Sequence, residues 1–200
     1  MILTDKEIRK LSNAEKGLIV PFSEDALQSE SYDLSIGNTI AVLKKAVKCI
    51  DLRDQKDVDS IYEEQSLSDS GYILSPKEYI LVALKEKVNL TDNITAHIRP
   101  RTRFTRLGLL VSDQHCNSTY EGVLKVGLLN VTDYAIKIFP GIRIAQIVFE
   151  ELKSVPSENK KYMNKKNAVY QGENEFIGAK FTDEFQKKVS ATVELLLKKD

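Results

Sequence analysis

The feature that constrains this chain most is a series of short apolar segments separated by turn residues. The turns include Ser75 to Glu78 and Thr132 to Asp133, and Gly37 with Asn38 predicts a turn or bulge inside a longer segment. The segments that we expect to be strands are 18–22, 31–43, 72–74, 79–84, 93–98, 123–131, 135–139 and 142–152. Short strands at this frequency are typical of an all-β sandwich or barrel. The sequence therefore predicts a mainly β fold.

Helices are expected at both ends of the chain. Thr4 followed by Glu7 forms a capping box, and the helix that it starts is expected to end at Gly17. Residues 182–199 place apolar side chains at helical spacing, with acidic residues first and lysines last, as the helix dipole favours. We expect this C-terminal helix to pack on its own domain or on a neighbouring subunit; docking of a foreign partner is the alternative.

Two polar stretches interrupt the pattern. Residues 44–70 are charged, and their spaced aspartates lack the spacing and the glycine of a calcium loop, so we interpret them as a solvated connection. Residues 153–166 are rich in lysine and have no periodicity, which is typical of a mobile, solvated loop.

The composition of the chain limits the classes of partner and the cellular compartment that we expect. The 200 residues include 29 lysines and arginines and 29 aspartates and glutamates, so no net charge attracts the chain to nucleic acid or to an anionic membrane. No apolar run approaches the ~18 residues of a membrane-spanning helix, and the N-terminus does not predict a signal peptide. Two distant cysteines are typical of free thiols in a reducing compartment. We expect a cytoplasmic protein without nucleic-acid or membrane partners.

The densest chemical signal is a cluster of three arginines. Arg101, Arg103 and Arg106 alternate with Thr102 and other residues. A guanidinium fork suits phosphate oxygens, and a threonine hydroxyl can add a hydrogen bond. Because a polar hairpin ending at Tyr120 follows, the stretch predicts a site for a phosphorylated, ring-bearing ligand. The alternative is a basic strand edge beside a surface hairpin.

Zinc chemistry has no support in the sequence. Zinc-dependent deamination requires a trio of histidine or cysteine ligands with a nearby glutamate. His97 and His115 are each isolated, and the chain contains no Cys-x-x-Cys. We therefore expect no protein-bound metal and interpret both histidines as core or surface residues.

Five motifs in order resemble one family. Arg101 to Gly108 resembles the R-S-S-x-x-R-x-G signature of the dCTP deaminase branch of the trimeric dUTPase superfamily. Tyr120 to Gly122 resembles the aromatic-x-Gly of its nucleoside-binding hairpin, and Pro140 to Ile147 is similar to the G-x-R-I-A-Q motif of dUTPases. Residues 1–8 and 31–38 are also similar to dCTP deaminase, and residues 170–172 resemble its C-terminal lid.

The resemblance implies a dUTPase-like distorted jelly roll or β-barrel. Together with the helices expected at both ends, it divides the chain into a β domain over residues 1–152 that includes the N-terminal helix, a mobile lid over 153–180 and a C-terminal helix over 181–200. That last helix, predicted from its spacing, extends beyond the usual end of the family. The resemblance also implies a homotrimer that binds a deoxynucleoside triphosphate between subunits, with Mg²⁺ held through the triphosphate. The implied reactions are deamination of dCTP to dUTP and hydrolysis of dUTP, both by water that a carboxylate activates as general base.

Only some of the family's site residues are present at the matching positions of this sequence. The residues that it implies for the site are Arg101, Thr102, Arg103, Arg106, Asn117, Tyr120, Gln146, Tyr170 and Gln171. The general bases are missing, because Asn117 stands at the aspartate of dUTPases and Gly127 at the glutamate of the deaminases. Asp113 and Glu121 are the nearby carboxylates, and Glu173 stands where a glutamine of the lid would touch the base.

Three hypotheses follow. The first is a hydrolase of the dCTP deaminase or dUTPase type, with Arg106, Thr102 and Asp113 as its catalytic residues. The second is a catalytically degenerate relative that binds a nucleotide as a sensor or scaffold. The third is a structural trimer module without a ligand.

Overall fold

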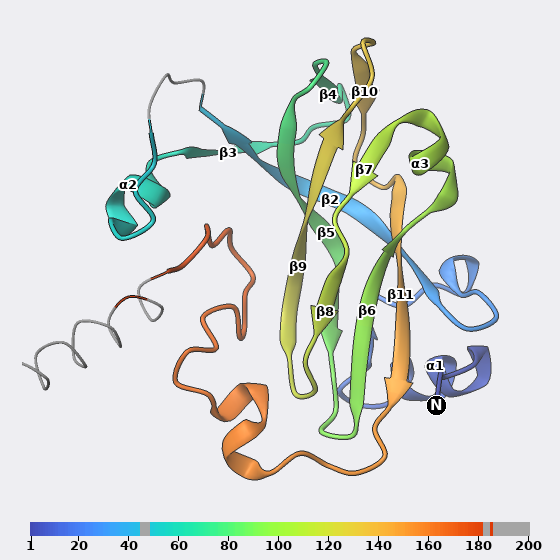
Figure 1. The fold of residues 1–200 in the computed structure, drawn as a ribbon. Coiled ribbons are helices and arrows are strands. Elements are labelled where there is room, and N and C mark those ends of the chain that lie inside the picture. The colour runs from blue at the N-terminus through green and yellow to red at the C-terminus, as the bar shows by residue number, and fades with distance from the viewer. Residues whose placement is uncertain (45–48, 182–184, 186–200) are drawn as a thin grey trace, which may run out of the picture.

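The computed structural model describes residues 1–44, 49–181 and 185, and this part of the chain is mainly antiparallel β-sheet (Figure 1). The strands are β1 (Ile19–Val20), β2 (Tyr32–Leu43), β3 (Tyr62–Ser66), β4 (Tyr72–Leu74), β5 (Tyr79–Asn89), β6 (Ile94–Pro100), β7 (Leu109–Val111), β8 (Gln114–Cys116), β9 (Glu121–Asn130), β10 (Ile136–Ile138) and β11 (Arg143–Glu151). The predicted mainly β fold is confirmed.

The nine-stranded sheet curls back on itself. Its order is β7-β9-β5-β2-β11-β6-β8, with β1 paired to β5 and β3 paired to β2. Strands β7 and β8 lie at opposite ends of this order, yet only Ser112 and Asp113 separate them in the chain. The two ends of the sheet must therefore meet, which gives the barrel-like curvature visible in Figure 1.

The interior of the curl is filled by alternate residues of the strands. In β5, Ile80, Val82 and Leu84 are buried, and their neighbours in sequence are more exposed. Such a period of two is what a half-buried strand requires. The register between β2 and β5 shifts between Ile36 and Ile40, which confirms the bulge expected at Gly37 and Asn38.

The N-terminal helix α1 spans Asp5–Ser12 and begins with the predicted capping box, in which the Thr4 backbone N–H donates to Glu7 Oε2 (2.9 Å). The helix ends before Gly17, so the predicted end was too late. Asn13 is the C-cap residue, and its backbone N–H donates to Arg9 O and Leu11 O. The predicted C-terminal helix spans residues 182–199. Apart from residue 185, these residues lie outside the part of the chain that the structure describes.

The prediction of a solvated connection over residues 44–70 was wrong for residues 49–70, which contain regular structure. They contain α2 (Gln55–Asp59), whose N-cap Asp54 accepts hydrogen bonds from two backbone N–H groups, and the edge strand β3. The arginine stretch also differs from the predicted alternative of a strand edge, because it folds into the short helix α3 (Thr102–Leu107). Gly108 ends that helix in the left-handed conformation (φ 85°).

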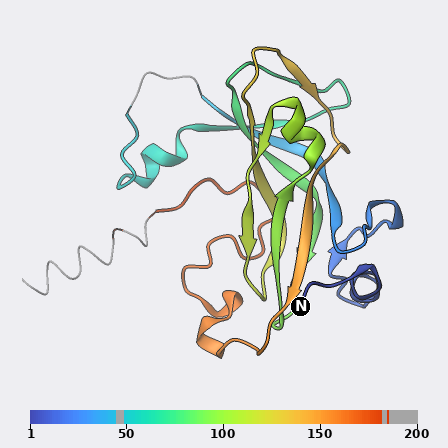
Figure 2. The same ribbon diagram turned by 45° about the vertical axis from the view of Figure 1, so that its right-hand side comes forward.

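The segment after β11 runs past the open end of the sheet and then along the outside of the β8–β9 hairpin, as both views agree (Figures 1 and 2). It contains two short 3₁₀ helices, η2 (Glu158–Lys160) and η3 (Tyr162–Asn164). In the described part of the chain, no helix has the length and apolar character needed to cross a membrane.

Candidate functional site

The arginine cluster lines a cleft of about 400 Å³, which we call the arginine corner. Its residues come from α3, from β2 and β11, and from the loop before β2. They are Gln28, Asp33, Arg101, Thr102, Arg103, Arg106 and Gln146. The structure thus brings together four predicted residues of the arginine stretch with the predicted Gln146.

Arg101 is fixed at the base of this cleft by a carboxylate. Its Nη2 lies 3.1 Å from Oδ2 of Asp33, and its Nη1 donates to Arg143 O (3.2 Å). The Asp33 side chain is only 2% exposed, and it lies opposite Gln146 in the pairing of β2 with β11. Burial raises the pKa of the Asp33 carboxyl, and the Arg101 guanidinium acts in the opposite direction.

The other two arginines are available to a ligand. Arg103 and Arg106 lie on the exposed face of α3, and neither forms an ion pair with another described residue. The cleft therefore carries three guanidinium groups and one carboxylate, which leaves an excess of positive charge. An anion with several oxygens, such as a phosphate chain, matches that surplus.

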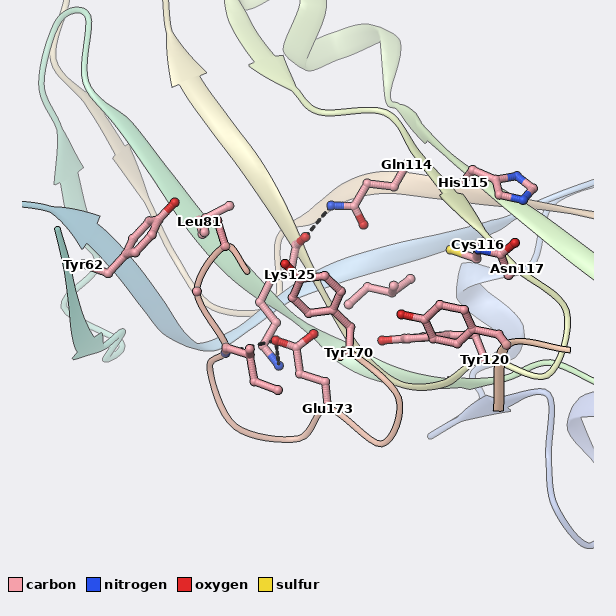
Figure 3. A pocket seen from close by; sticks show the side chains of 15 residues that line it. Tyr62, Leu81, Gln114, His115, Cys116, Asn117, Tyr120, Lys125, Tyr170 and Glu173 are labelled. Carbon is pink, nitrogen blue, oxygen red and sulfur yellow. Dashed lines mark hydrogen bonds and ion pairs between the residues drawn. The ribbon is translucent and has the colours of Figure 1, made fainter. Parts of the chain in front are cut away.

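The segment that follows β11, residues 152–181, is called the C-terminal segment below. A second cleft, of about 440 Å³, lies between β5, the β8–β9 hairpin and this C-terminal segment (Figure 3). We call it the hairpin pocket. It is lined by Tyr62, Leu81, Gln114, His115, Cys116, Asn117, Tyr120, Leu124, Lys125, Tyr162, Tyr170, Glu173, Ile177, Gly178 and Ala179. Four tyrosines among these residues make it suitable for a planar ring.

Tyr120, the predicted sugar-contacting residue, lies deep in this pocket. It is only 5% exposed, and its ring centroid is 5.9 Å from that of Tyr162. Burial raises the pKa of its hydroxyl. This hydroxyl is buried and has no hydrogen-bond partner in the described structure. Because buried polar groups are nearly always paired, it is a point at which a polar atom of a ligand would gain a bond.

An ion pair closes the pocket on the side of the C-terminal segment. Lys125 Nζ on β9 lies 3.4 Å from Glu173 Oε1, and the two side chains are 8% and 6% exposed. Burial raises the pKa of Glu173 and lowers that of Lys125, and the attraction between the charges opposes both shifts. Figure 3 shows the two side chains pointing toward each other beside Tyr170.

The C-terminal segment is bound to the hairpin through its backbone. Gly172 N donates to Glu121 O (2.8 Å), and Val123 N donates to Glu173 O (2.7 Å). The Gln171 side chain donates to Thr119 O (3.1 Å). The predicted binding residue Gln171 therefore attaches the segment to the hairpin, whereas the predicted Tyr170 lines the pocket itself.

The sequence was compared with known protein families. Residues 2–152 match the family described as dCTP deaminase-like. This chain belongs to that family. A relative from Persephonella marina named "dCTP deaminase, dUMP-forming" is 32% identical over 160 residues, which cover 80% of this chain and 88% of the relative. A "dCTP deaminase" from Natronomonas pharaonis is 30% identical over 179 residues, covering 86% and 91%.

The solved structure of 2′-deoxycytidine 5′-triphosphate deaminase from Agrobacterium tumefaciens has the same fold. It aligns with a TM-score of 0.62 at 22% identity, over 79% of this chain and 50% of that chain. The recognised resemblance to the dCTP deaminase branch is thus confirmed at the level of family and fold.

Position 127, where we expected the glutamate of the deaminases, is occupied by glycine, and a side chain there would meet a neighbour. A Cβ added to Gly127 would lie 2.4 Å from the Tyr79 hydroxyl oxygen and 2.7 Å from Cε2 of the same ring. Gly127 is two residues from Lys125 along β9, so both residues face the side of the sheet that carries the hairpin pocket. The Tyr79 phenol therefore occupies the space that a glutamate side chain would need.

The structure does not bring the remaining predicted base into either cleft. Asp113 lies in the short loop between β7 and β8, where its Oδ2 is 3.1 Å from Arg99 Nη1, and its side chain is 57% exposed. Asn117 does line the hairpin pocket, but an amide cannot act as a base at neutral pH.

Sequence reasoning missed several residues of both clefts. Asp33 is part of a recognised motif, but its contact with Arg101 depends on strand pairing that the sequence does not display. Lys125 could have been noticed in the sequence, because it is a charged residue between the apolar residues of strand β9. His97 and His115 are isolated in the sequence but are cross-strand partners in the structure, with ring centroids 4.9 Å apart.

Proposed function

We propose that this protein binds a deoxynucleoside triphosphate and holds the phosphates in the arginine corner. The observation that carries the proposal is the arrangement of guanidinium groups there. Arg101 is held in place by Asp33, while Arg103 and Arg106 remain free of ion pairs with described residues. The predicted Thr102 and Gln146 add a hydroxyl and an amide to the same cleft. Membership of a family whose relatives are named for dCTP supports this class of ligand.

The ring of the nucleotide belongs, in this proposal, to the hairpin pocket. The two clefts share no lining residue, so one chain presents them as separate places. We propose that a single ligand contacts both clefts where they come from different copies of the chain. The proposal therefore includes a homotrimer in which the arginine corner of one subunit faces the hairpin pocket of its neighbour.

Magnesium enters this proposal with the nucleotide. The described residues contain no group of three or more histidine, cysteine, aspartate or glutamate side chains placed to hold a metal ion. The carboxylate of the arginine corner, Asp33, is already bound to Arg101. Mg²⁺ would therefore be held by the phosphate oxygens, where it neutralises part of their charge.

We propose further that the protein does not use the general base of its relatives. Position 127 has no side chain, and the Tyr79 ring fills the adjacent space. A positioned general base typically contributes ~10²–10⁴ in rate. A binding site that lacks it fits a nucleotide sensor or scaffold, and this is the function that the geometry favours.

One observation favours deamination of dCTP as a second candidate function. Glu173 places a buried carboxylate, the type of group that acts as a general base, in the hairpin pocket, and burial raises the pKa of this carboxyl. In this mechanism a water oxygen bonds to C4 of cytosine while one of its two protons passes to Glu173. The C4–N4 bond then breaks, and the amino group leaves as ammonia with that proton. The proton of the remaining C4 hydroxyl moves to N3, which gives the C4 carbonyl of uracil. Asp113 does not line this pocket, and its carboxylate pairs with Arg99.

The two candidates are separated by measuring binding and turnover together. The full chain is mixed with dCTP or dUTP and magnesium. Thermal shift reports binding, ammonia release reports deamination and phosphate release reports hydrolysis. A shift without turnover supports the sensor or scaffold, and ammonia release from dCTP supports the enzyme. The absence of both signals would refute nucleotide binding, and a monomer by light scattering at micromolar concentration would refute the composite site.

A further inference from the structure

Residues 51–66, which contain α2 and β3, form an arm that stands apart from the barrel. The arm is attached to the main sheet through β3, whose residues 62–66 pair with residues 39–43 at the end of β2. Both ribbon views show the end of the C-terminal segment passing beside α2 (Figures 1 and 2). The arm and the C-terminal segment are far apart in the sequence, so their contact is a property of the fold.

Gln55 on α2 binds the backbone of the C-terminal segment at two points. Its Nε2 donates to Ala179 O (2.8 Å), and its Oε1 accepts from Phe181 N (3.0 Å). The carboxylate of Asp59, one helical turn later, also accepts from this Nε2 (2.8 Å), which holds the amide in its orientation. The side-chain amide thus offers the segment one donor and one acceptor, as a strand backbone would.

An ion pair lies beside this contact. Lys180 Nζ is 2.8 Å and 3.0 Å from the two carboxylate oxygens of Asp59. The hydrogen bond from Lys180 lowers the pKa of the Asp59 carboxyl, which keeps this group ionised at neutral pH. Among the described residues, every hydrogen bond that residues 176–181 form outside the C-terminal segment goes to the arm.

The arm also forms part of the hairpin pocket. Tyr62, the first residue of β3, lines that pocket, and its ring meets the Phe176 ring edge to face with centroids 5.2 Å apart. A Cβ added to Gly178 would lie 3.4 Å from Tyr62 Cδ2, so the segment passes directly along this ring. The C-terminal segment is therefore attached at two places, to the hairpin through residues 171–173 and to the arm through residues 176–181.

We infer that the arm is a clasp, in which Gln55 and Asp59 are positioning residues that keep the C-terminal segment closed over the hairpin pocket. Tyr170 and Glu173 line the pocket from that segment. Losing the attachment to the arm would free the end of the segment, so the wall that these two side chains form would open more often. The inference goes beyond the proposed function, because it holds whatever ligand the pocket takes.

A charge exchange tests the clasp in the free chain. Amide hydrogen exchange over residues 170–179 is compared for the wild type, Asp59→Lys, Lys180→Asp and the variant with both changes. Each single change places like charges opposite each other, so exchange is expected to accelerate about three- to tenfold. The double variant restores opposite charges and is expected to recover the larger part of the protection. The matched control is Glu63→Lys, because Glu63 is an exposed acid of the same arm whose described hydrogen bond is to Gln65 (3.2 Å).

The melting temperature and the exchange of the β5 amides report whether each variant keeps its fold, and both are expected to match the wild type. Lys180 lies outside the arm, so its replacement tests the contact without altering the arm itself. Unchanged exchange over residues 170–179 in both single variants would overturn the clasp. A double variant that exchanges as fast as the single variants would also overturn it, as would equal acceleration in Glu63→Lys. The measurement uses no nucleotide, so its failure and a failure of nucleotide binding are distinguishable.

Discussion

Replacing Gly127 by glutamate tests whether Tyr79 is what excludes a side chain from position 127. The new Cβ would lie 2.4 Å from the Tyr79 hydroxyl oxygen, 2.7 Å from Cε2 and 2.8 Å from Cζ. Contacts below 3.0 Å are essentially never seen for a real Cβ, so the ring has to move. The Tyr79 side chain is partly buried, and burial raises the pKa of its hydroxyl.

The magnitude follows from the packing. Overpacking a filled site typically costs about 1–3 kcal/mol. For a chain of this size, that corresponds to a melting temperature lower by about 2–12 °C, at about 2–4 °C per kcal/mol. Tyr79→Ala removes a partly buried ring, so it should cost less than the about 3–5 kcal/mol of a fully buried aromatic. In the double variant the glutamate occupies the vacated space, and the clash disappears.

The assay is a double-mutant cycle by chemical denaturation, together with ammonia release from dCTP. We expect the double variant to be more stable than the sum of the two single changes predicts, by about 1–3 kcal/mol. We also expect it to deaminate dCTP at least ~10²-fold faster than Gly127→Glu alone, because only the double variant can position its carboxylate. Gly127→Gln combined with Tyr79→Ala is the control with equal volume and no basicity. Additive stabilities would show that the Tyr79 ring is not the obstacle.

Three further outcomes are expected. Arg106→Ala should abolish the thermal shift that dCTP causes. The melting temperature of the free protein should stay unchanged, because the Arg106 side chain has no ion pair with a described residue. The control Arg53→Ala, which changes a residue outside both clefts, should keep the thermal shift. Lys125→Met should leave Glu173 buried without its partner, a change that costs about 3–5 kcal/mol when neither group reaches water, and hydrogen exchange over residues 170–179 should therefore accelerate. Burial raises the pKa of the Glu86 carboxyl in the folded protein. The contribution of this group to the free energy of unfolding is therefore fully present below the unfolded pKa of 4.5, and it is lost as the pH rises through the folded pKa. Denaturation from about pH 4 to about pH 8 should therefore show Glu86→Gln gaining stability relative to the wild type, and parallel curves would contradict this.

Two of the strands that the sequence predicted, β5 and β9, have one face that is more buried than the other. Strands β5 and β9 alternate in burial because they line the interior, and this alternation is a local property of the sequence. Strand β3 was missed because Tyr62 to Ser66 has no such alternation. Its place depends on backbone pairing with β2 at an edge of the sheet, and backbone pairing leaves no mark on side-chain order.

The helix α3 was missed for a different reason. Arg101 to Arg106 alternates charged and uncharged residues, which is typical of an exposed strand edge, yet the chain turns into a helix after β6. The readable signal was Gly108, because a glycine at this place ends helices in the left-handed conformation. A Cβ there would lie 2.4 Å from Thr132 Cγ2, so the close approach of that side chain also requires glycine.

In the two clefts, motifs in the sequence identified single side chains. They did not identify side chains that form a pair between distant segments of the chain. The arginines, Gln146 and Tyr120 could be recognised from motifs, and the structure places each of them in a cleft. The ion pair between Lys125 and Glu173 joins a strand to a segment far along the chain. No spacing rule connects the two residues, so only their contact in the structure reveals the pair.

The location of the acidic group changes how the hairpin pocket must work. A carboxylate at position 127 would be part of the sheet and present at all times, but Gly127 has none. Glu173 reaches the pocket only while the C-terminal segment is docked on the hairpin. Any ligand that bonds to Glu173 therefore stabilises the docked segment, and by linkage the docked segment strengthens binding of that ligand by the same factor.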